Sequence, residues 1–213
     1  MCLFPTGRSW NKHAAPDVEY SDPMEAFLIS TGLVAIAEIG DKTNILAMIL
    51  ATRYRQPIPV ILGILVATLA NHALAASVGA AVAAWLGPQA MRWILAVLFL
   101  VMAGWCLIPD KEDDGPKSVG KLGAFLATTV AFFLVEMGDK TQLATMGLAA
   151  RFHSVVLVTA GTTAGMLLAN VPAVLFGDVL SRKLSLKFMR TIAAVSFLVL
   201  GALTLMGVDL GLF

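Results

Sequence analysis

A charged hexapeptide occurs twice in this chain of 213 residues, as Glu38-Ile-Gly-Asp41-Lys42-Thr43 and as Glu136-Met-Gly-Asp139-Lys140-Thr141. Carboxylate, hydroxyl and amide oxygens are the ligands that hard divalent cations such as Mn²⁺, Ca²⁺ and Mg²⁺ prefer. The two copies therefore predict the two halves of one cation site. The expected ligands are Glu38, Asp41, Thr43, Glu136, Asp139 and Thr141, with Lys42 and Lys140 as charge compensation and Asn44, Gln142, Asn71 and Asn170 as auxiliary groups.

The spacing inside each copy predicts how the charges lie. In a helix, Asp41 and Lys42 would share one face with Glu38, because they follow it by three and four residues. Gly40 and Gly138 weaken the helix at the charged cluster and permit a kink or a short unwound stretch, which would free carbonyl oxygens as further ligands. His72 is either a functional group or the partner in a hydrogen bond between helices.

The rest of the chain predicts an all-α integral membrane protein. Hydrophobic residues make up 58% of it, charged residues only 14%, and the mean hydropathy is +0.83. Soluble domains are less apolar and carry about 25% charged residues. No basic face with interleaved aromatic residues is present, so nucleic acid is not expected as a partner. Six apolar stretches approach the roughly 20 residues that span a bilayer: 25–51, 58–84, 90–108, 122–149, 155–179 and 188–207.

The two halves of the chain repeat with an offset of 98 residues. Beyond the hexapeptide, Gly63 corresponds to Gly161 and Phe99 to Phe197, while Asn71 corresponds to Asn170 if one residue is inserted. Three spans per unit would place the second unit upside down, as in many secondary transporters. We expect a polar, disordered tail at 1–23, one three-helix repeat at 24–108, a cytoplasmic linker at 109–121 and the second repeat at 122–213.

Basic residues in the loops predict the orientation of the chain. The more basic side of the membrane should be cytoplasmic, which leaves both termini outside. That side carries Arg53, Arg55, Lys111, Lys117, Lys121, Arg182, Lys183, Lys187 and Arg190, whereas the other carries Arg8, Lys12, Arg92 and Arg151. The two cysteines, Cys2 and Cys106, then lie on opposite sides, and Cys106 is expected to be a small apolar packing residue.

Charge balance suggests a mechanism. Four carboxylates and two ammonium groups leave two negative charges, which one divalent cation or two protons would neutralise. A bare cluster of that charge is strongly disfavoured in a low dielectric, so the pattern favours exchange of a metal ion for protons. If the charges only formed ion pairs that pin two spans together, the excess of acid would have no explanation.

Two E-x-G-D-K-T copies on the first and fourth of six spans resemble the cation transporter family with the E-x-G-D-[KR]-[ST] signature. The likeness extends over about 24–207, and both motifs match in full. This family includes eukaryotic Golgi transporters of Mn²⁺ and Ca²⁺ and bacterial manganese exporters of the MneA type. The resemblance implies two inverted three-helix repeats, metal coordination by the acidic motifs and exchange against H⁺.

The favoured function is export of Mn²⁺ from the cytoplasm, with no enzymatic activity and no cofactor besides the transported ion. The short chain without a long leader favours a bacterial inner (plasma) membrane, where the protein would be a monomer or a homodimer. Three alternatives stay open: a Ca²⁺/H⁺ exchanger, an intramembrane metal-dependent hydrolase and a non-transporting accessory subunit. The hydrolase is disfavoured because a phosphate site would need arginine or histidine, and the core of the spans holds no arginine and one histidine.

Overall fold

The computed structural model describes residues 23–108, 123–183 and 186–206. Almost all of the expected tail (1–23) and the whole expected linker (109–121) lie outside the described residues. The described part folds into eight helices with no strand. They are α1 (Pro23–Glu38), α2 (Lys42–Tyr54), α3 (Pro57–Trp85), α4 (Pro88–Cys106), α5 (Ala124–Glu136), α6 (Lys140–Phe152), α7 (Val155–Lys183) and α8 (Leu186–Met206).

The expected spans 25–51 and 122–149 are each two helices, because the chain unwinds at both hexapeptides. Gly40 and Gly138 have φ of +78°, a left-handed conformation that costs other residues about 1–2 kcal/mol. The helix therefore ends at the glutamate of each motif and restarts after the aspartate. The unwound stretch predicted at the glycines is present, but the prediction that Glu38, Asp41 and Lys42 share one helical face is wrong.

Three helical segments are long and apolar enough to cross a membrane, namely Pro57–Trp85, Gln89–Cys106 and Val155–Phe176. Ala124–Glu136 and Arg190–Met206 are shorter apolar helices. The structure thus supports an all-helical membrane protein. It establishes three spans where six were expected. The breaks shorten two of them below the length that crosses a bilayer, and the apolar part of α8 that the structure describes, Arg190–Met206, is also too short.

Each broken helix packs against a long helix from the other half of the chain. A Cβ atom added at Gly63 of α3 would lie 2.8 Å from the Phe125 carbonyl oxygen of α5. At Gly161 of α7 it would lie 2.5 Å from the Phe27 carbonyl oxygen of α1. Both glycines and both phenylalanines correspond at the offset of 98, so the same close backbone approach occurs twice.

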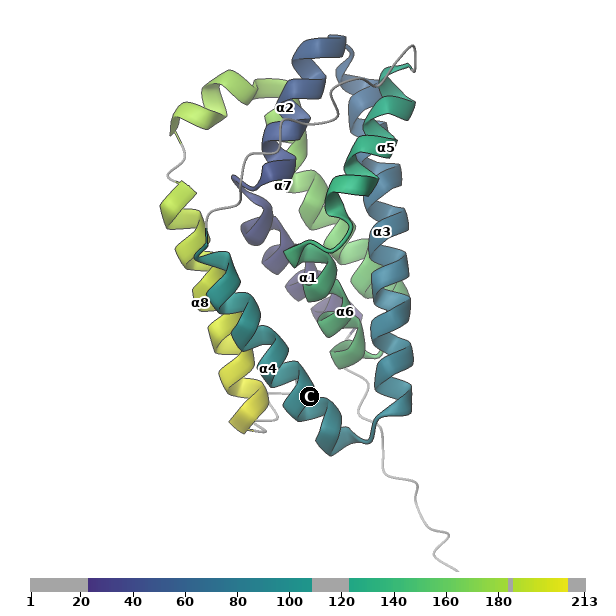
Figure 1. Ribbon diagram of the computed structural model, residues 1–213, viewed down its shortest axis with the longest axis vertical. Helices are drawn as coiled ribbons and strands as arrows, with labels where there is room; N and C mark the ends of the chain where they lie inside the picture. Colours follow the sequence, from purple (N-terminus) through teal and green to yellow (C-terminus); the bar gives the residue numbers. More distant parts are fainter. Residues whose placement is uncertain (1–22, 109–122, 184–185, 207–213) are drawn as a thin grey trace, which may run out of the picture.

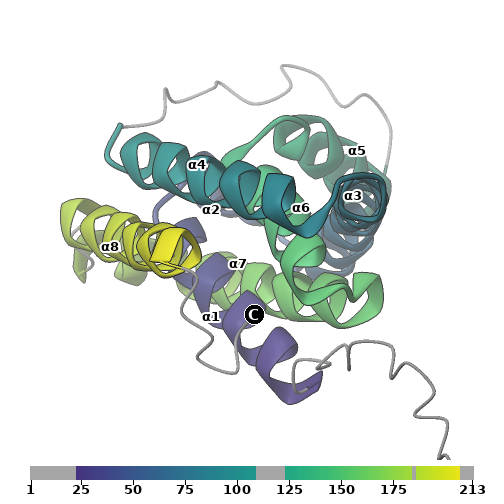
Figure 2. The same cartoon turned by 90° about the horizontal axis from the view of Figure 1, so that it is seen from below.

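The pair α4 and α8 lies beside one end of this arrangement. The two helices pack against each other, and the rings of Phe99 and Phe197 stack with centroids 6.3 Å apart. Both run alongside α1 and α6, while α2 and α5 extend beyond them (Figures 1 and 2). We call the end where α1 begins and α6 finishes the α1–α6 end, and the opposite end the α2–α5 end.

Candidate functional site

The four carboxylates of the hexapeptides lie at the two helix breaks. Glu38 and Glu136 are the last residues of α1 and α5 and are fully buried, and Asp41 and Asp139 precede α2 and α6 with 3% of each residue exposed. The left-handed glycines turn the chain so that each aspartate is placed next to its glutamate. The amide of Asp41 still donates to the Glu38 carbonyl at 3.0 Å, and Asp139 repeats this bond to Glu136 at 3.2 Å.

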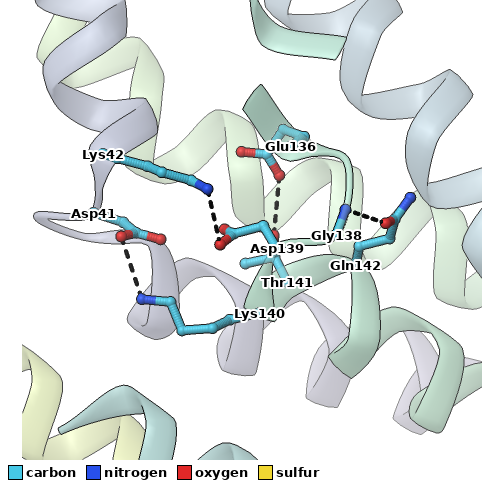
Figure 3. Close-up of polar contacts among 8 residues, drawn as sticks. All are labelled: Asp41, Lys42, Glu136, Gly138, Asp139, Lys140, Thr141 and Gln142. Carbon is cyan, nitrogen blue, oxygen red and sulfur yellow. Dashed lines mark hydrogen bonds and ion pairs between the residues drawn. The ribbon is translucent and has the colours of Figure 1, made fainter. Parts of the chain in front are cut away.

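Each lysine pairs with the aspartate of the other half of the chain. Lys42 Nζ lies 3.2 Å from Asp139 Oδ1, and Lys140 Nζ lies 3.3 Å from Asp41 Oδ1 (Figure 3). The side chain of Lys42 is 21% exposed and that of Lys140 is 6% exposed. These reciprocal pairs hold the two breaks face to face, which spacing within one motif could not reveal.

Three of the four carboxylates converge as metal ligands would. Oxygen atoms of Glu38, Asp41 and Asp139 all lie within 4.8 Å of one another. Neither Glu38 oxygen has a hydrogen-bond partner by distance and angle among the described residues, although the side chain of Asn170 is close enough to act on it. Glu136 is outside this trio and accepts a hydrogen bond from Thr141 Oγ1 at 3.0 Å.

The two threonines differ although they are equivalent in sequence. Thr141 is bonded to Glu136, whereas the buried Thr43 hydroxyl has no hydrogen-bond partner within the described ranges. The hydroxyl oxygen of Thr43, which belongs to the same hexapeptide as Glu38, is therefore available to bind a ligand. The two motifs thus contain the same side chains, but the threonine hydroxyl is hydrogen-bonded to the glutamate only in the second motif.

The expected auxiliary amides tie the broken helices to the long ones. Asn44 Nδ2 donates to the Ala169 carbonyl at 2.9 Å and lies 3.5 Å from Asn170 Oδ1, both in α7. Gln142 Nε2 lies 3.4 Å from Asn71 Oδ1 in α3, and its Oε1 accepts the amide of Gly138 at 2.7 Å (Figure 3). These side-chain amides therefore already have hydrogen-bond partners in the protein. The amide of Gln142 stabilises the unwound turn through its bond to Gly138.

His72 is fully buried in α3, and neither of its ring nitrogens has a hydrogen-bond partner in the described part of the chain. The hydrogen bond between helices that was one expectation for it is therefore not formed. The convergent trio of carboxylates does not include His72.

Two residues near the site did not stand out in the sequence. Arg190 at the start of α8 and Cys106 at the end of α4 line a small cavity together with Asp41 and Lys140. Cys106 is buried among apolar residues as expected, and it also faces this cavity. Arg190 thus places a guanidinium beside the carboxylates, although the cores of the expected spans hold no arginine. Only a three-dimensional arrangement could reveal both contacts, because neither residue is near a hexapeptide in sequence.

These features define a class of protein. Buried charges in an apolar bundle are costly, by about 2.5–3.5 kcal/mol each on insertion scales, and are usually functional. Helix breaks that place acidic groups and free backbone deep in such a bundle are typical of secondary transporters. The fold and the site together are those of a membrane transporter for cations.

Comparison with known families agrees with this class. Residues 26–114 and 124–210 match the model of the family described as "Divalent cation/proton antiporter GDT1". The two matched stretches begin 98 residues apart, which is the offset of the sequence repeat. The chain belongs to the GDT1 family of divalent cation/proton antiporters.

Several curated proteins are similar over most of their length. A Vibrio cholerae protein named "Putative manganese exporter" is 51% identical over 182 residues, which cover 85% of this chain and 90% of that protein. "GDT1-like protein 5" of Arabidopsis thaliana is 27% identical over 226 residues, covering 86% and 96% of the two chains. A GDT1-like protein of Synechocystis is 28% identical over 196 residues, covering 82% and 93%. No solved structure matches this chain.

The family assignment confirms the resemblance seen in the two motifs. It also shows that the protein is a transporter and not an enzyme, which removes the metal-dependent hydrolase from the alternatives. The family is described as one of antiporters, which favours transport over the role of a non-transporting accessory subunit.

Proposed function

We propose that this protein exports Mn²⁺ from the cytoplasm in exchange for H⁺, through a mid-membrane carboxylate site built from both hexapeptides. The observation that carries the proposal is the reciprocal pairing of each lysine with the other half's aspartate, at two opposed helix breaks. It supports an arrangement of six membrane crossings in two inverted three-helix repeats, in which α1 with α2 and α5 with α6 each make one broken crossing.

The ion pairs support the charge balance of an exchanger. Lys42 with Asp139 and Lys140 with Asp41 form two neutral pairs, so the remaining negative charges belong to Glu38 and Glu136. Neither glutamate forms an ion pair within the described ranges, and both are fully buried. An uncompensated buried charge is costly. One divalent ion or two protons can supply the compensation, and this equivalence is the basis of exchange.

The ligand set favours a hard divalent ion. The convergent groups of Glu38, Asp41 and Asp139 are all oxygen atoms, and the free hydroxyl of Thr43 belongs to the same half as two of them. Mn²⁺ and Ca²⁺ both accept such ligands, so a Ca²⁺/H⁺ exchanger is the second candidate. Manganese takes precedence because the relative that is 51% identical to this chain over 182 residues has manganese in its name.

Orientation follows from the basic loops. We place the α2–α5 end in the cytoplasm and both termini outside, in the inner membrane of a bacterium, with the protein as a monomer or homodimer. Export then requires that the site take up its ion from the α2–α5 end and release it at the α1–α6 end.

The decisive experiment measures flux of Mn²⁺, Ca²⁺ and Mg²⁺ in proteoliposomes, with and without a pH gradient. Wild type is compared with Asp139→Asn and with Thr129→Val, a control on α5 whose exposed hydroxyl bonds only its own helix. We expect Mn²⁺ flux that depends on the gradient, disappears in Asp139→Asn and persists in Thr129→Val. Faster Ca²⁺ flux would select the second candidate. Flux that ignores the pH gradient would reject proton exchange, and a folded protein that moves no divalent ion would reject transport.

A further inference from the structure

We propose that the ion reaches the carboxylates through the cavity between the ends of α4 and α8, from the α2–α5 end, while the α1–α6 end is closed by α4 packed on α6 and by the buried Arg151. This inference rests on the proposed function, since it names the route to the same site. Arg151 closes one end and Cys106 and Arg190 line the route, and none of the three belongs to a hexapeptide.

The cavity lies between the site and the ends of α4 and α8 that face the α2–α5 end. Its wall contains Asp41 and Lys140 from the site, Cys106 from the last turn of α4 and Arg190 from the first turns of α8. Its volume is about 10 Å³, room for about one water molecule. An ion that has shed most of its water could pass there, and the first carboxylate that it would meet is Asp41.

The opposite end is sealed by direct contact between α4 and α6. A Cβ atom added at Gly147 of α6 would lie 2.9 Å from Leu98 Cδ2 and 3.2 Å from Phe99 Cε1 of α4. The residue that corresponds to Gly147 in the first half is Ile49 of α2, and it is 44% exposed. The face of α6 around Gly147 is therefore covered by α4, whereas the equivalent face of α2 around Ile49 is exposed.

The ends of α2 and α6 show the same contrast. Both helices finish with a basic and an aromatic residue and then a left-handed cap, with φ of 53° at Arg55 and 50° at His153. Arg53 is exposed, yet its counterpart Arg151 is only 6% exposed. Because the local conformations agree, the difference comes from tertiary packing.

Arg151 lies buried in the last turn of α6, close enough to α1 for the charge of Glu25 to act on it. Its guanidinium carbon lies 5.2 Å from the centroid of the Phe152 ring, and the carboxylate of Glu25 in α1 acts on it as an opposite charge. A guanidinium in a membrane protein is buried only where partners offset the loss of water. Removing the charge of Arg151 is therefore expected to weaken the attraction between α6 and α1 at this end.

The inverted relation of the halves defines the alternative state. If the two halves exchanged conformations, α8 would cover the Ile49 face of α2, Arg53 would become buried, and α4 would leave α6. That state would have the same kinds of contacts as the present one, so the two are expected to be close in energy. The site would then open at the α1–α6 end.

Cys106 provides a native probe of the route. The chain has two cysteines, so a Cys2→Ser background leaves Cys106 as the single thiol. Silver ion, supplied as the nitrate in chloride-free buffer, is small enough to follow a metal ion and binds thiols. It is added to one face at a time, using membrane vesicles of each orientation, and both Mn²⁺ flux and silver bound to the protein are measured. Cys106→Ala is the control for silver acting elsewhere.

We expect silver to bind from the α2–α5 face at least ten times faster than from the other face, to block flux, and to be slowed by excess Mn²⁺. Arg151→Gln should reduce that preference by at least threefold, because it loosens the closed end, whereas Arg53→Gln should leave it unchanged. Equal binding from both faces, no binding to Cys106, or identical behaviour of the two arginine variants would overturn the proposal. One-sided silver binding without Mn²⁺ flux would instead refute the proposed function and leave the route intact.

Discussion

The reciprocal ion pairs lead to a sharp prediction for Lys140. Replacing it with methionine keeps most of the volume of the side chain and leaves Asp41 as a buried charge without its lysine. The two side chains are 6% and 2% exposed, and their charged atoms are 3.3 Å apart. Removing one partner of such a buried pair costs about 3–5 kcal/mol. The side chain of Lys42 is 21% exposed, so Lys42→Met should cost about 1–2 kcal/mol, between the values for exposed and buried pairs.

A double-mutant cycle separates this pairing from pairing within one motif. Stability is measured as the thermal midpoint of the purified protein in one detergent at fixed concentration, for Lys140→Met, Asp41→Asn and the double variant. We expect the double variant to recover about 1–3 kcal/mol relative to the sum of the single changes, because the stranded charge is gone. The cycle of Lys140→Met with Asp139→Asn should show a much smaller coupling. If Lys140 coupled to Asp139 more strongly than to Asp41, the reciprocal arrangement would be refuted.

Two further predictions concern the unwound turns and the threonines. Gly138→Ala should destabilise the protein by about 1–2 kcal/mol through its φ of +78° alone, since no atom lies within 4 Å of an added Cβ. Gly104→Ala, equally free of contacts but inside α4, should be neutral or slightly stabilising in the same thermal assay, and equal effects would contradict the reasoning. Thr141→Val should cost about 1–3 kcal/mol because it strands an oxygen of Glu136. Thr43→Val breaks no hydrogen bond among the described residues, so it should affect Mn²⁺ affinity in a flux titration more than stability; the reverse ranking would exclude its hydroxyl as a ligand.

Much of the fold follows from patterns in the sequence. Apolar stretches, breakers and the offset of 98 residues predicted helices close to those observed for α3, α4, α7 and α8. The glycine in each hexapeptide predicted the unwound stretch. The expectation of one helical face failed at the same place, because the left-handed glycine rotates Asp41 away from the helix that Glu38 ends.

The site was predicted as a set of residues but not as a set of contacts. The sequence indicated which side chains are acidic and that two motifs must cooperate. It did not show that Lys42 reaches Asp139. Nor did it show that Glu136 accepts a hydrogen bond from Thr141 while, by distance and angle, neither oxygen of Glu38 has a partner among the described residues. Such choices depend on side chains that are almost 100 residues apart, whose distance is set by how the two halves pack.

The sequence by itself determined that this protein is a membrane protein built from a repeated unit, and it predicted that the chemistry lies in two acidic motifs. Composition and spacing suffice for these conclusions because burying a charge in an apolar environment costs free energy, so charged residues there usually have a function. Only the tertiary structure decided that the two ends of the molecule are packed differently. Arg53 and Arg151 occupy equivalent positions with the same local backbone, and one is exposed while the other is buried. Equivalent sequences cannot encode that difference locally, because it arises from where α4 and α8 pack.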